Sequence, residues 1–176
     1  MEIIRITSVG DKFFEPVWKI FTESFPLFER RTIGQQETAF RSEYYRMECY
    51  LDRRRVVGFT AYWDFPGYLY IEYFAVDAAL RSGGYGGKIL KPLLENAGKP
   101  IIIEIDPQVD ETSMRRLRFY ERLGFARNPF AHPAYIYQPE HHIDTPMTIL
   151  TYPAAITREM YERFDSDMRG IVLKRD

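Results

Sequence analysis

The sequence predicts an α+β domain built around one mixed β-sheet. Residues 44–51, 56–65 and 68–76 have the pattern of three strands separated by short turn segments, which is typical of antiparallel hairpins. A segment with helical periodicity then leads to the apolar run 100–106. Two strands joined through a helix lie parallel in a sheet. The predicted sheet therefore changes from antiparallel to parallel after residue 76.

The N-terminal part is predicted to supply one strand and two helices. Residues 3–7 alternate in polarity and predict the first strand. Apolar residues between positions 13 and 25 recur with the period of a helix. Pro26 should end that helix, because proline disfavours helical geometry in the residue before it. A loop over residues 26–34 and a short helix over 35–41 should follow.

The C-terminal half continues the alternation of helices and strands. The helix after residue 76 should end at Gly98, and Pro92 inside it should remove one hydrogen bond and bend it. The nearly continuous apolar run 100–106 predicts a strand that is buried on both faces. The remaining predicted elements are a helix over 111–123, strands over 134–138 and 147–152, and a helix over 158–169.

The composition is that of a single-domain globular protein. Of the 176 residues, 45% are hydrophobic and 28% charged, and 24 basic against 25 acidic side chains give a net charge of −1. This balance gives no electrostatic reason to expect nucleic acid or a membrane as a partner. The lone Cys49 reads as a buried apolar residue, and neither a signal peptide nor an apolar span of ~20 residues is evident. We expect one domain over residues 1–176, in the cytoplasm.

Residues 81–88 form a glycine-rich turn, Arg-Ser-Gly-Gly-Tyr-Gly-Gly-Lys, between a predicted strand and a predicted helix. The first amides of a helix lack internal partners, and the helix dipole adds partial positive charge there. Glycine also lets a phosphate approach the backbone closely. The turn therefore predicts an anion site for a phosphate-bearing ligand.

Two common phosphate motifs do not fit this turn. The P-loop string is absent, and a dinucleotide fingerprint would require an early βαβ unit. The turn does match the pattern Gln/Arg-x-x-Gly-x-Gly/Ala, as Arg81-x-x-Gly84-x-Gly86. A second segment, Phe-Tyr-Glu-Arg-Leu-Gly-Phe over residues 119–125, lies at the end of the next predicted helix. Together these motifs resemble those of the GNAT N-acetyltransferase superfamily.

The resemblance implies a GNAT fold, with six to seven strands, a V-shaped splay between the fourth and fifth strands, and about four to five flanking helices. It further implies that acetyl-CoA binds in the splay as a co-substrate, without a metal. The residues expected to contact it are Phe74, Ala75, Val76, Arg81, Ser82, Gly83, Gly84, Tyr85, Gly86, Gly87, Lys88 and Ser113. Ser113 replaces the family's usual asparagine, so its contact is expected to be shorter or lost.

The resemblance also implies acetyl transfer to a primary amine of a small molecule or peptide, by direct attack in a ternary complex. Tyr120 matches the family's tyrosine and is the candidate acid for the leaving thiolate. Glu104 is one candidate base, because it interrupts an isoleucine run where an unpaired carboxylate would be costly to bury. Glu72 is the other, and alternation places it on the face of Tyr70 and Phe74. A third alternative is a base-free path through water.

The acceptor pocket implied by the family lies between the loop after the first helix and the last strand pair. Its candidate residues are Phe28, Glu29, Arg30 and Tyr137, with Tyr62, Trp63 and Tyr135 as further aromatic walls. Aromatic rings beside carboxylates suit a cationic amine. His141 and His142 are not expected to bind a metal, because adjacent loop residues seldom chelate one ion.

Two other functions stay open from the sequence. The chain could bind acyl-CoA as a sensor or scaffold domain without turnover, or bind another phosphate ligand on an unrelated fold. Neither the acceptor nor the oligomeric state, monomer or homodimer, can be read from these residues.

Overall fold

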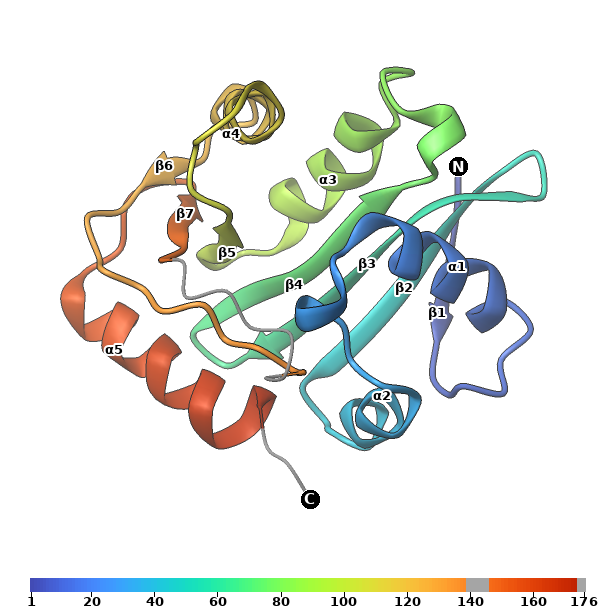
Figure 1. The fold of residues 1–176 in the computed structure, drawn as a ribbon, viewed down its shortest axis with the longest axis horizontal. Helices are drawn as coiled ribbons and strands as arrows, with labels where there is room; N and C mark the ends of the chain where they lie inside the picture. Colours follow the sequence, from blue (N-terminus) through green and yellow to red (C-terminus); the bar gives the residue numbers. More distant parts are fainter. Residues whose placement is uncertain (139–145, 174–176) are drawn as a thin grey trace.

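The computed structural model describes residues 1–138 and 146–173, which form a seven-stranded mixed sheet flanked by helices (Figure 1). The strand order is β1-β2-β3-β4-β5-β7-β6. The strands are β1 (Glu2–Ile6), β2 (Tyr45–Asp52), β3 (Arg55–Phe65), β4 (Tyr68–Val76), β5 (Ile101–Ile105), β6 (Ala126–Arg127) and β7 (Thr148–Tyr152). The helices are α1 (Phe14–Ser24), α2 (Ile33–Phe40), α3 (Tyr85–Asn96), α4 (Glu111–Arg122) and α5 (Arg158–Asp167), with short 3₁₀ helices η1 (Leu27–Glu29) and η2 (Ala78–Leu80) and a π-helical segment η4 (Met168–Val172).

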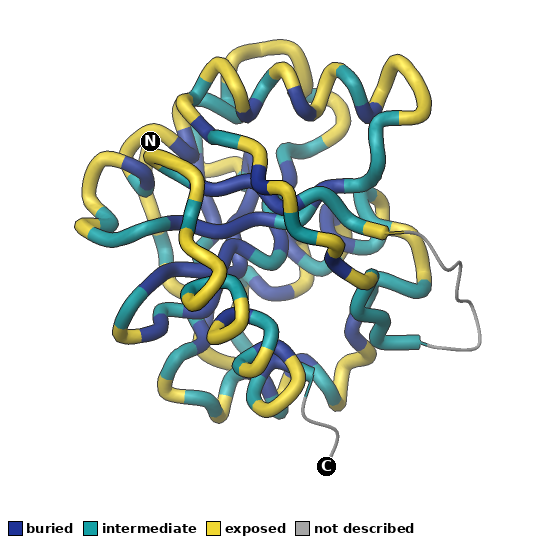
Figure 2. The backbone as a smooth tube through the Cα atoms, turned by 90° about the vertical axis from the view of Figure 1, so that its left-hand side faces the viewer, coloured by how far each residue is buried: buried dark blue, intermediate teal, exposed yellow. Residues whose placement is uncertain are grey.

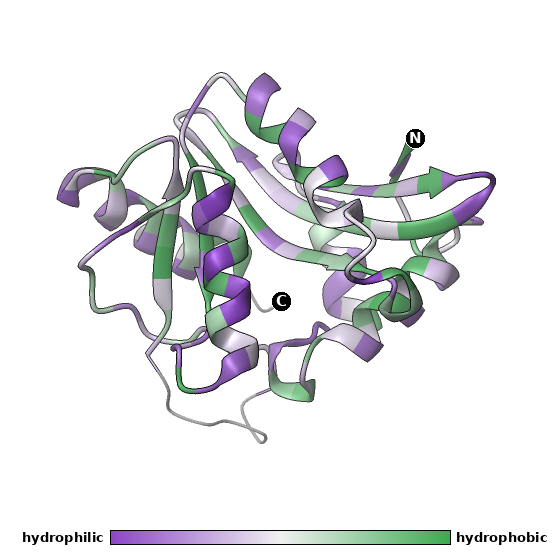
Figure 3. Cartoon of the chain, turned by 90° about the horizontal axis from the view of Figure 1, so that it is seen from above, coloured by the Kyte–Doolittle hydropathy of each residue, from purple (hydrophilic) through white to green (hydrophobic). Residues whose placement is uncertain are grey.

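Helices cover both faces of the sheet. One hydrophobic core joins apolar residues of α1, α2 and α5 to one face, and a second joins α3 and α4 to the other. Figure 2 shows the buried segments, in dark blue, at the centre of the fold. Figure 3 shows hydrophilic residues alternating with hydrophobic ones along the flanking helices, as expected for helices that bury one side.

Strands β4 and β5 are paired over only three residues. Leu69, Tyr70 and Ile71 lie opposite Ile101, Ile102 and Ile103 in parallel register. Beyond Ile71 and Ile103 the two strands separate, and β4 runs on to Val76 paired, among the described strands, with β3 alone. The predicted splay between the fourth and fifth strands is therefore confirmed.

A β-bulge interrupts β4 directly at this fork. Ala61 of β3 lies opposite Tyr73, but the next residue, Tyr62, lies opposite Ile71, so Glu72 has no partner on β3. The extra residue changes the alternation that the sequence predicts. Phe74 packs on the side of α3 and α4, whereas Glu72 contacts residues of the opposite core. The prediction that the two share a face was wrong.

The predicted strand over residues 134–138 was also wrong. In this part of the chain the structure has β6 and a single bridge between His132 and Met147 instead. The Tyr137 amide donates at 3.0 Å to the carbonyl oxygen of Phe28, a residue in the loop after α1. The segment therefore follows that loop and not the sheet edge.

Among the described residues, no helix combines the length and apolar character that a membrane span requires.

Candidate active site

The glycine-rich turn leads into the N-terminus of α3. Gly84 caps the helix with φ of +79°, a conformation that glycine adopts without strain. The first backbone bond of α3 runs from the Lys88 amide to the Gly84 carbonyl oxygen at 3.2 Å. In the described chain, the amides of residues 85–87 therefore have no backbone acceptor, which leaves three donors at the positive end of the helix dipole.

The space around these glycines fits a phosphate group. A Cβ atom added at Gly84 or Gly87 would meet no atom within 4 Å, so the backbone there is open to a ligand. A Cβ at Gly86 would lie 3.1 Å from the Phe119 ring, so glycine allows this close approach of α3 to Phe119 of α4. Open glycines beside unpaired amides match the requirements of a pyrophosphate site.

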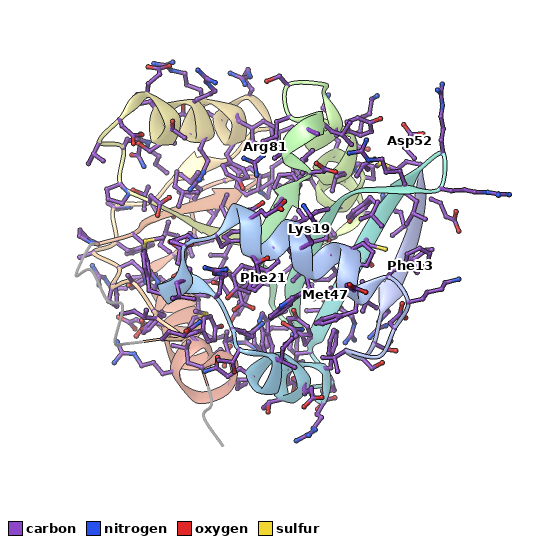
Figure 4. All side chains as sticks on the ribbon, turned by 45° about the vertical axis from the view of Figure 1, so that its right-hand side comes forward. Phe13, Lys19, Phe21, Met47, Asp52 and Arg81 are labelled. Carbon is purple, nitrogen blue, oxygen red and sulfur yellow. The ribbon has the colours of Figure 1, made fainter. Side chains whose placement is uncertain are left out.

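Side chains at the ends of the turn are tied to neighbouring elements. Arg81 donates to the Ser24 hydroxyl at 3.0 Å and to the Val76 carbonyl oxygen at 3.3 Å, and Figure 4 shows it beside α1. The Tyr85 hydroxyl donates to Asp52 at 2.6 Å, which lowers the pKa of that carboxyl group. The turn is thus connected to α1 on one side and to the β2–β3 hairpin on the other.

Ser113 differs from the other predicted cofactor contacts. It is buried, and its hydroxyl donates to Asp110 and accepts from the amides of Val109 and Asp110 at 3.1 Å each. Asp110 in turn accepts from the Ser113 amide, so the two residues form a capping box at the start of α4. The hydroxyl is used within the protein, and the arrangement gives no support to a contact with acetyl-CoA.

Tyr120 lies on α4, on the same side of the sheet as α3. Its ring packs edge-on against Phe119 and Phe125. In the described chain its hydroxyl forms no hydrogen bond, and burial raises its pKa to about 12. The side chain is therefore protonated at neutral pH and free to donate.

Glu104 is the first residue of β5 beyond the segment that pairs with β4. Its side chain lies on the opposite face of the sheet from Tyr120. One carboxylate oxygen accepts from the Tyr70 hydroxyl at 2.6 Å, and the other contacts the His132 Nε2 atom. Sequence reasoning missed His132, because a contact between residues 28 positions apart leaves no local pattern. The structure thus supplies the partners that a buried carboxylate needs.

Glu72, the other candidate base, is fully engaged in a buried ion pair. It lies 2.8 Å from the Arg31 guanidinium, and the two side chains are only 3% and 1% exposed. Trp63 donates to it at 2.8 Å and the Tyr137 hydroxyl donates to its second oxygen. Burial raises the pKa of this carboxyl group, while Arg31 and the hydrogen bonds oppose the increase.

The aromatic cluster predicted as an acceptor wall holds Arg31 instead. Four rings lie within 6 Å of the guanidinium, those of Tyr45, Trp63, Tyr73 and Tyr137. Of the other predicted walls, Tyr62 packs with α3 and α4 on the far face, and Tyr135 bonds to Asp165 of α5. The rings thus stabilise a cation that belongs to the protein.

The loop after α1 lies beside residues 137–138, and both segments belong to the predicted acceptor pocket, which stays a prediction. The Phe28 carbonyl oxygen accepts from the Tyr137 amide, and Gln138 donates to the Arg30 carbonyl oxygen at 2.9 Å. Glu29 lies near Asp106 and Glu104. Burial, reinforced by these two carboxylates, raises its pKa to about 7. The loop over residues 139–145, including His141 and His142, is outside the described residues.

A cavity of about 530 Å³ borders the Arg31 side of the aromatic cluster. Its lining includes Arg31, Trp63 and Tyr137, but neither the glycine-rich turn nor Glu104 or Tyr120. Over residues 1–138 and 146–173, no three His, Cys, Asp or Glu side chains gather as a metal site would require.

Comparisons with known proteins find similar chains among the acetyltransferases. A putative acetyltransferase of Bacillus subtilis (strain 168), YjbC, is 29% identical over 108 residues, which are 59% of this chain and 53% of that protein. The chain thus spans about half the length of this curated relative. A putative GNAT acetyltransferase structure from Bacteroides thetaiotaomicron is 28% identical with a TM-score of 0.89, covering 100% of both chains.

A more distant structure shares the fold alone. It is a GNAT acetyltransferase from Elizabethkingia anophelis with acetyl-CoA bound, 16% identical with a TM-score of 0.57, covering 85% of this chain and 95% of that one. The family model described as "Acetyltransferase (GNAT) family" matches residues 14–125, which include the glycine-rich turn and both candidate catalytic strands. The chain therefore belongs to the GNAT family of acetyltransferases.

Proposed function

We propose that this protein transfers the acetyl group of acetyl-CoA to a primary amine of a small molecule or peptide, by direct attack in a ternary complex. The observation that carries the proposal is the position of Glu104. Its carboxylate stands at the point where β4 and β5 separate, one residue past their last pair. A proton acceptor at the opening of the splay is what an amine nucleophile needs.

The proposed binding site for acetyl-CoA follows the free side of β4. The amides of residues 85–87 would hold the pyrophosphate, with Arg81, Ser82, Gly83 and Lys88 around it. The pantetheine would lie along residues 74–76, which pair with no strand on the β5 side within the described chain. The co-substrate supplies the activated acetyl group.

Glu104 and Tyr120 have complementary proposed roles. Glu104 removes a proton from the acceptor ammonium, and Tyr120 donates one to the thiolate that leaves. The raised pKa of Tyr120, about 12, keeps its proton available at neutral pH. The two side chains lie on opposite faces of the sheet, so each can reach the splay without competing for the same space.

Glu72 is proposed to stabilise the fold and not to act as the base. A carboxylate already paired with Arg31 and two further donors has little capacity to accept another proton. Tyr137, which was predicted to contact the acceptor, donates its hydroxyl to Glu72 of this ion pair.

A cationic acceptor is favoured by the acidic groups on this side. Glu29, Glu104 and Asp106 lie close enough for their charges to interact, while Arg116 is paired with Asp106. We propose that Phe28, Glu29 and Arg30 form one side of the acceptor pocket.

Thiol release from acetyl-CoA in the presence of an amine panel tests the proposal. Wild-type protein should release free thiol with at least one cationic amine, and Tyr120→Phe should lower kcat by about tenfold or more. Acetyl-CoA should also raise the melting temperature. Stabilisation by acetyl-CoA with no thiol release over a wide panel would instead favour a sensor or scaffold. Stabilisation by ATP or NAD but not by CoA would contradict the cofactor assignment.

A further inference from the structure

A buried histidine connects the candidate base to α5. The His132 Nε2 atom contacts Glu104, and its Nδ1 atom lies 3.0 Å from the Tyr161 hydroxyl. Only 1% of His132 is exposed. Each ring nitrogen therefore has a polar partner in the protein, and the imidazole bridges β5 to α5 without contact with bulk water.

The surroundings hold the imidazole in one orientation. The His132 carbonyl oxygen accepts from the Met147 amide at 2.9 Å. The ring centroids of Tyr135, Tyr161 and Phe164 lie 5.3, 5.7 and 5.5 Å from that of His132. An imidazole packed this closely cannot exchange its two nitrogens without displacing its neighbours. The same nitrogen therefore always faces Glu104.

The Tyr161 hydroxyl has two acceptors within reach, His132 Nδ1 at 3.0 Å and the Ala131 carbonyl oxygen at 3.1 Å. When it donates to Nδ1, the imidazole is neutral and Nε2–H donates to an ionised Glu104. When the Tyr161 hydroxyl donates to Ala131, Nδ1–H of His132 donates to the hydroxyl oxygen. A proton must still lie between Nε2 and the Glu104 oxygen, because their two lone pairs would otherwise repel. Rotation of one hydroxyl thus allows the His132–Glu104 pair to hold one extra proton.

We propose that His132 is a positioning residue for acetyl transfer, which orients the Glu104 carboxylate and shares the proton that Glu104 takes from the acceptor amine. This proposal rests on the proposed role of Glu104. An ammonium N–H bond breaks and its proton joins the His132–Glu104 pair. The nitrogen lone pair forms the C–N bond while the C–S bond breaks and Tyr120 protonates the thiolate.

The proton balance is closed by two further transfers. Tyr120 regains its proton from the second N–H that the nitrogen loses on becoming an amide. The His132–Glu104 pair returns its proton to water, so each ammonium consumed releases one proton. Among the described residues, Tyr70, Glu29 and Asp106 lie near Glu104, and Tyr161 and Tyr135 lie near His132, with Asp165 and Arg169 bonded to Tyr135.

A double-mutant cycle between His132 and Glu104 tests the proposal. His132→Gln keeps a donor toward Glu104 but cannot take up a proton. It should lower kcat by about tenfold or more with an unchanged KM for acetyl-CoA, and it should cause no further loss when combined with Glu104→Gln. A purely structural role would instead give losses that multiply. Either multiplying losses or a kcat within about twofold of wild type would overturn the proposal.

Tyr161→Phe gives a second test if His132→Gln does not fold. It removes the rotating hydroxyl and keeps the ring, and kcat should fall about threefold. Tyr68→Phe is its matched control, because that tyrosine donates to Asp167 of α5 at 2.7 Å but does not touch Glu104. Equal kcat values for these two variants would contradict the link through Tyr161. If Glu104→Gln alone kept wild-type kcat, the base assignment itself would fail, whereas loss at Glu104 without loss at His132 would overturn only the role of His132.

Discussion

Strands β4 and β5 each have a glutamate at the first position where they no longer pair with one another. The two sites differ in what surrounds the carboxylate. Glu72 follows the last paired residue of β4, and Glu104 follows that of β5. Glu72 is closed in by Arg31, Trp63 and Tyr137, and its charge is matched. Glu104 has one hydrogen-bond partner on each oxygen and acidic residues nearby.

The difference shows that burial alone does not identify a catalytic acid or base. A carboxylate whose acceptor positions are filled by strong donors contributes to the fold, and breaking such a pair leaves an uncompensated charge. A carboxylate that is held in place but retains lone pairs can still accept a proton. The same substitution at the two sites should therefore affect different properties.

Glu72→Gln should produce the largest change in stability. The amide has the shape of the carboxylate but cannot neutralise Arg31, whose guanidinium stays charged and buried. We expect the free energy of unfolding to fall by roughly 3–5 kcal/mol, measured by denaturant titration. Arg31→Met combined with Glu72→Leu is the control, because it removes both charges and should restore part of the loss. Stability equal to wild type for Glu72→Gln would contradict the importance of the pair.

Glu104→Gln should produce the largest change in activity at little cost in stability. Loss of a general base should lower kcat by about 100-fold, or ~2.7 kcal/mol in the activation barrier. Steady-state kinetics at saturating acetyl-CoA and a melting curve together measure the two effects. If Glu72→Gln, corrected for its folded fraction, lost more activity than Glu104→Gln, the two roles would have to be exchanged.

Two tyrosines repeat the comparison with smaller effects. Tyr137→Phe removes a hydroxyl from the Glu72–Arg31 pair and should lower stability by about 1.5 kcal/mol with kcat preserved. Tyr70→Phe removes the 2.6 Å hydrogen bond to Glu104 and should lower kcat about threefold, with a smaller change in stability. Paired melting curves and kcat measurements would reveal the opposite pattern if the comparison were mistaken.

Glu29 should give the smallest effect, visible in its pH dependence. Its pKa, raised to about 7, means that the carboxyl group ionises as pH rises from 6 to 8. The KM for a cationic acceptor that stays charged over this range should therefore fall about two- to fivefold, the effect of a weak charge pair of ~0.5–1 kcal/mol. Glu29→Gln should remove this dependence. An unchanged pH profile in the variant would show that Glu29 does not face the acceptor.

Local sequence patterns were sufficient for most of the fold. The glycine-rich turn, the apolar run of β5 and the helical period of α1 each carry their own signal, so these elements lie within two residues of their predicted bounds. Residues 134–138 have the alternation of a strand, but the Tyr137 amide bonds to the loop after α1. Tertiary contacts decide the structure of such a short segment.

The site was predictable only where a residue type or motif marks it. Glu104 stood out because a charge interrupts isoleucines, and the turn stood out because of its glycines. The contacts of Arg31 and His132 could not be found in this way, because their partners Glu72 and Glu104 lie 41 and 28 positions along the chain. The bulge at Glu72 escaped prediction for a similar reason, since period-2 alternation contains no mark for an unpaired residue.

That bulge has a consequence for how the family can vary. Glu72 is the extra residue of the bulge. The side chains of Ile71, Tyr73 and Phe74 alternate between the two faces of the sheet as if Glu72 were absent. In a relative without this extra residue, the side chains on both halves of β4 could stay on the same faces of the sheet. It would, however, have no carboxylate here to balance a buried guanidinium. Positions 31 and 72 should therefore be gained and lost together among relatives, as a coupled pair of changes.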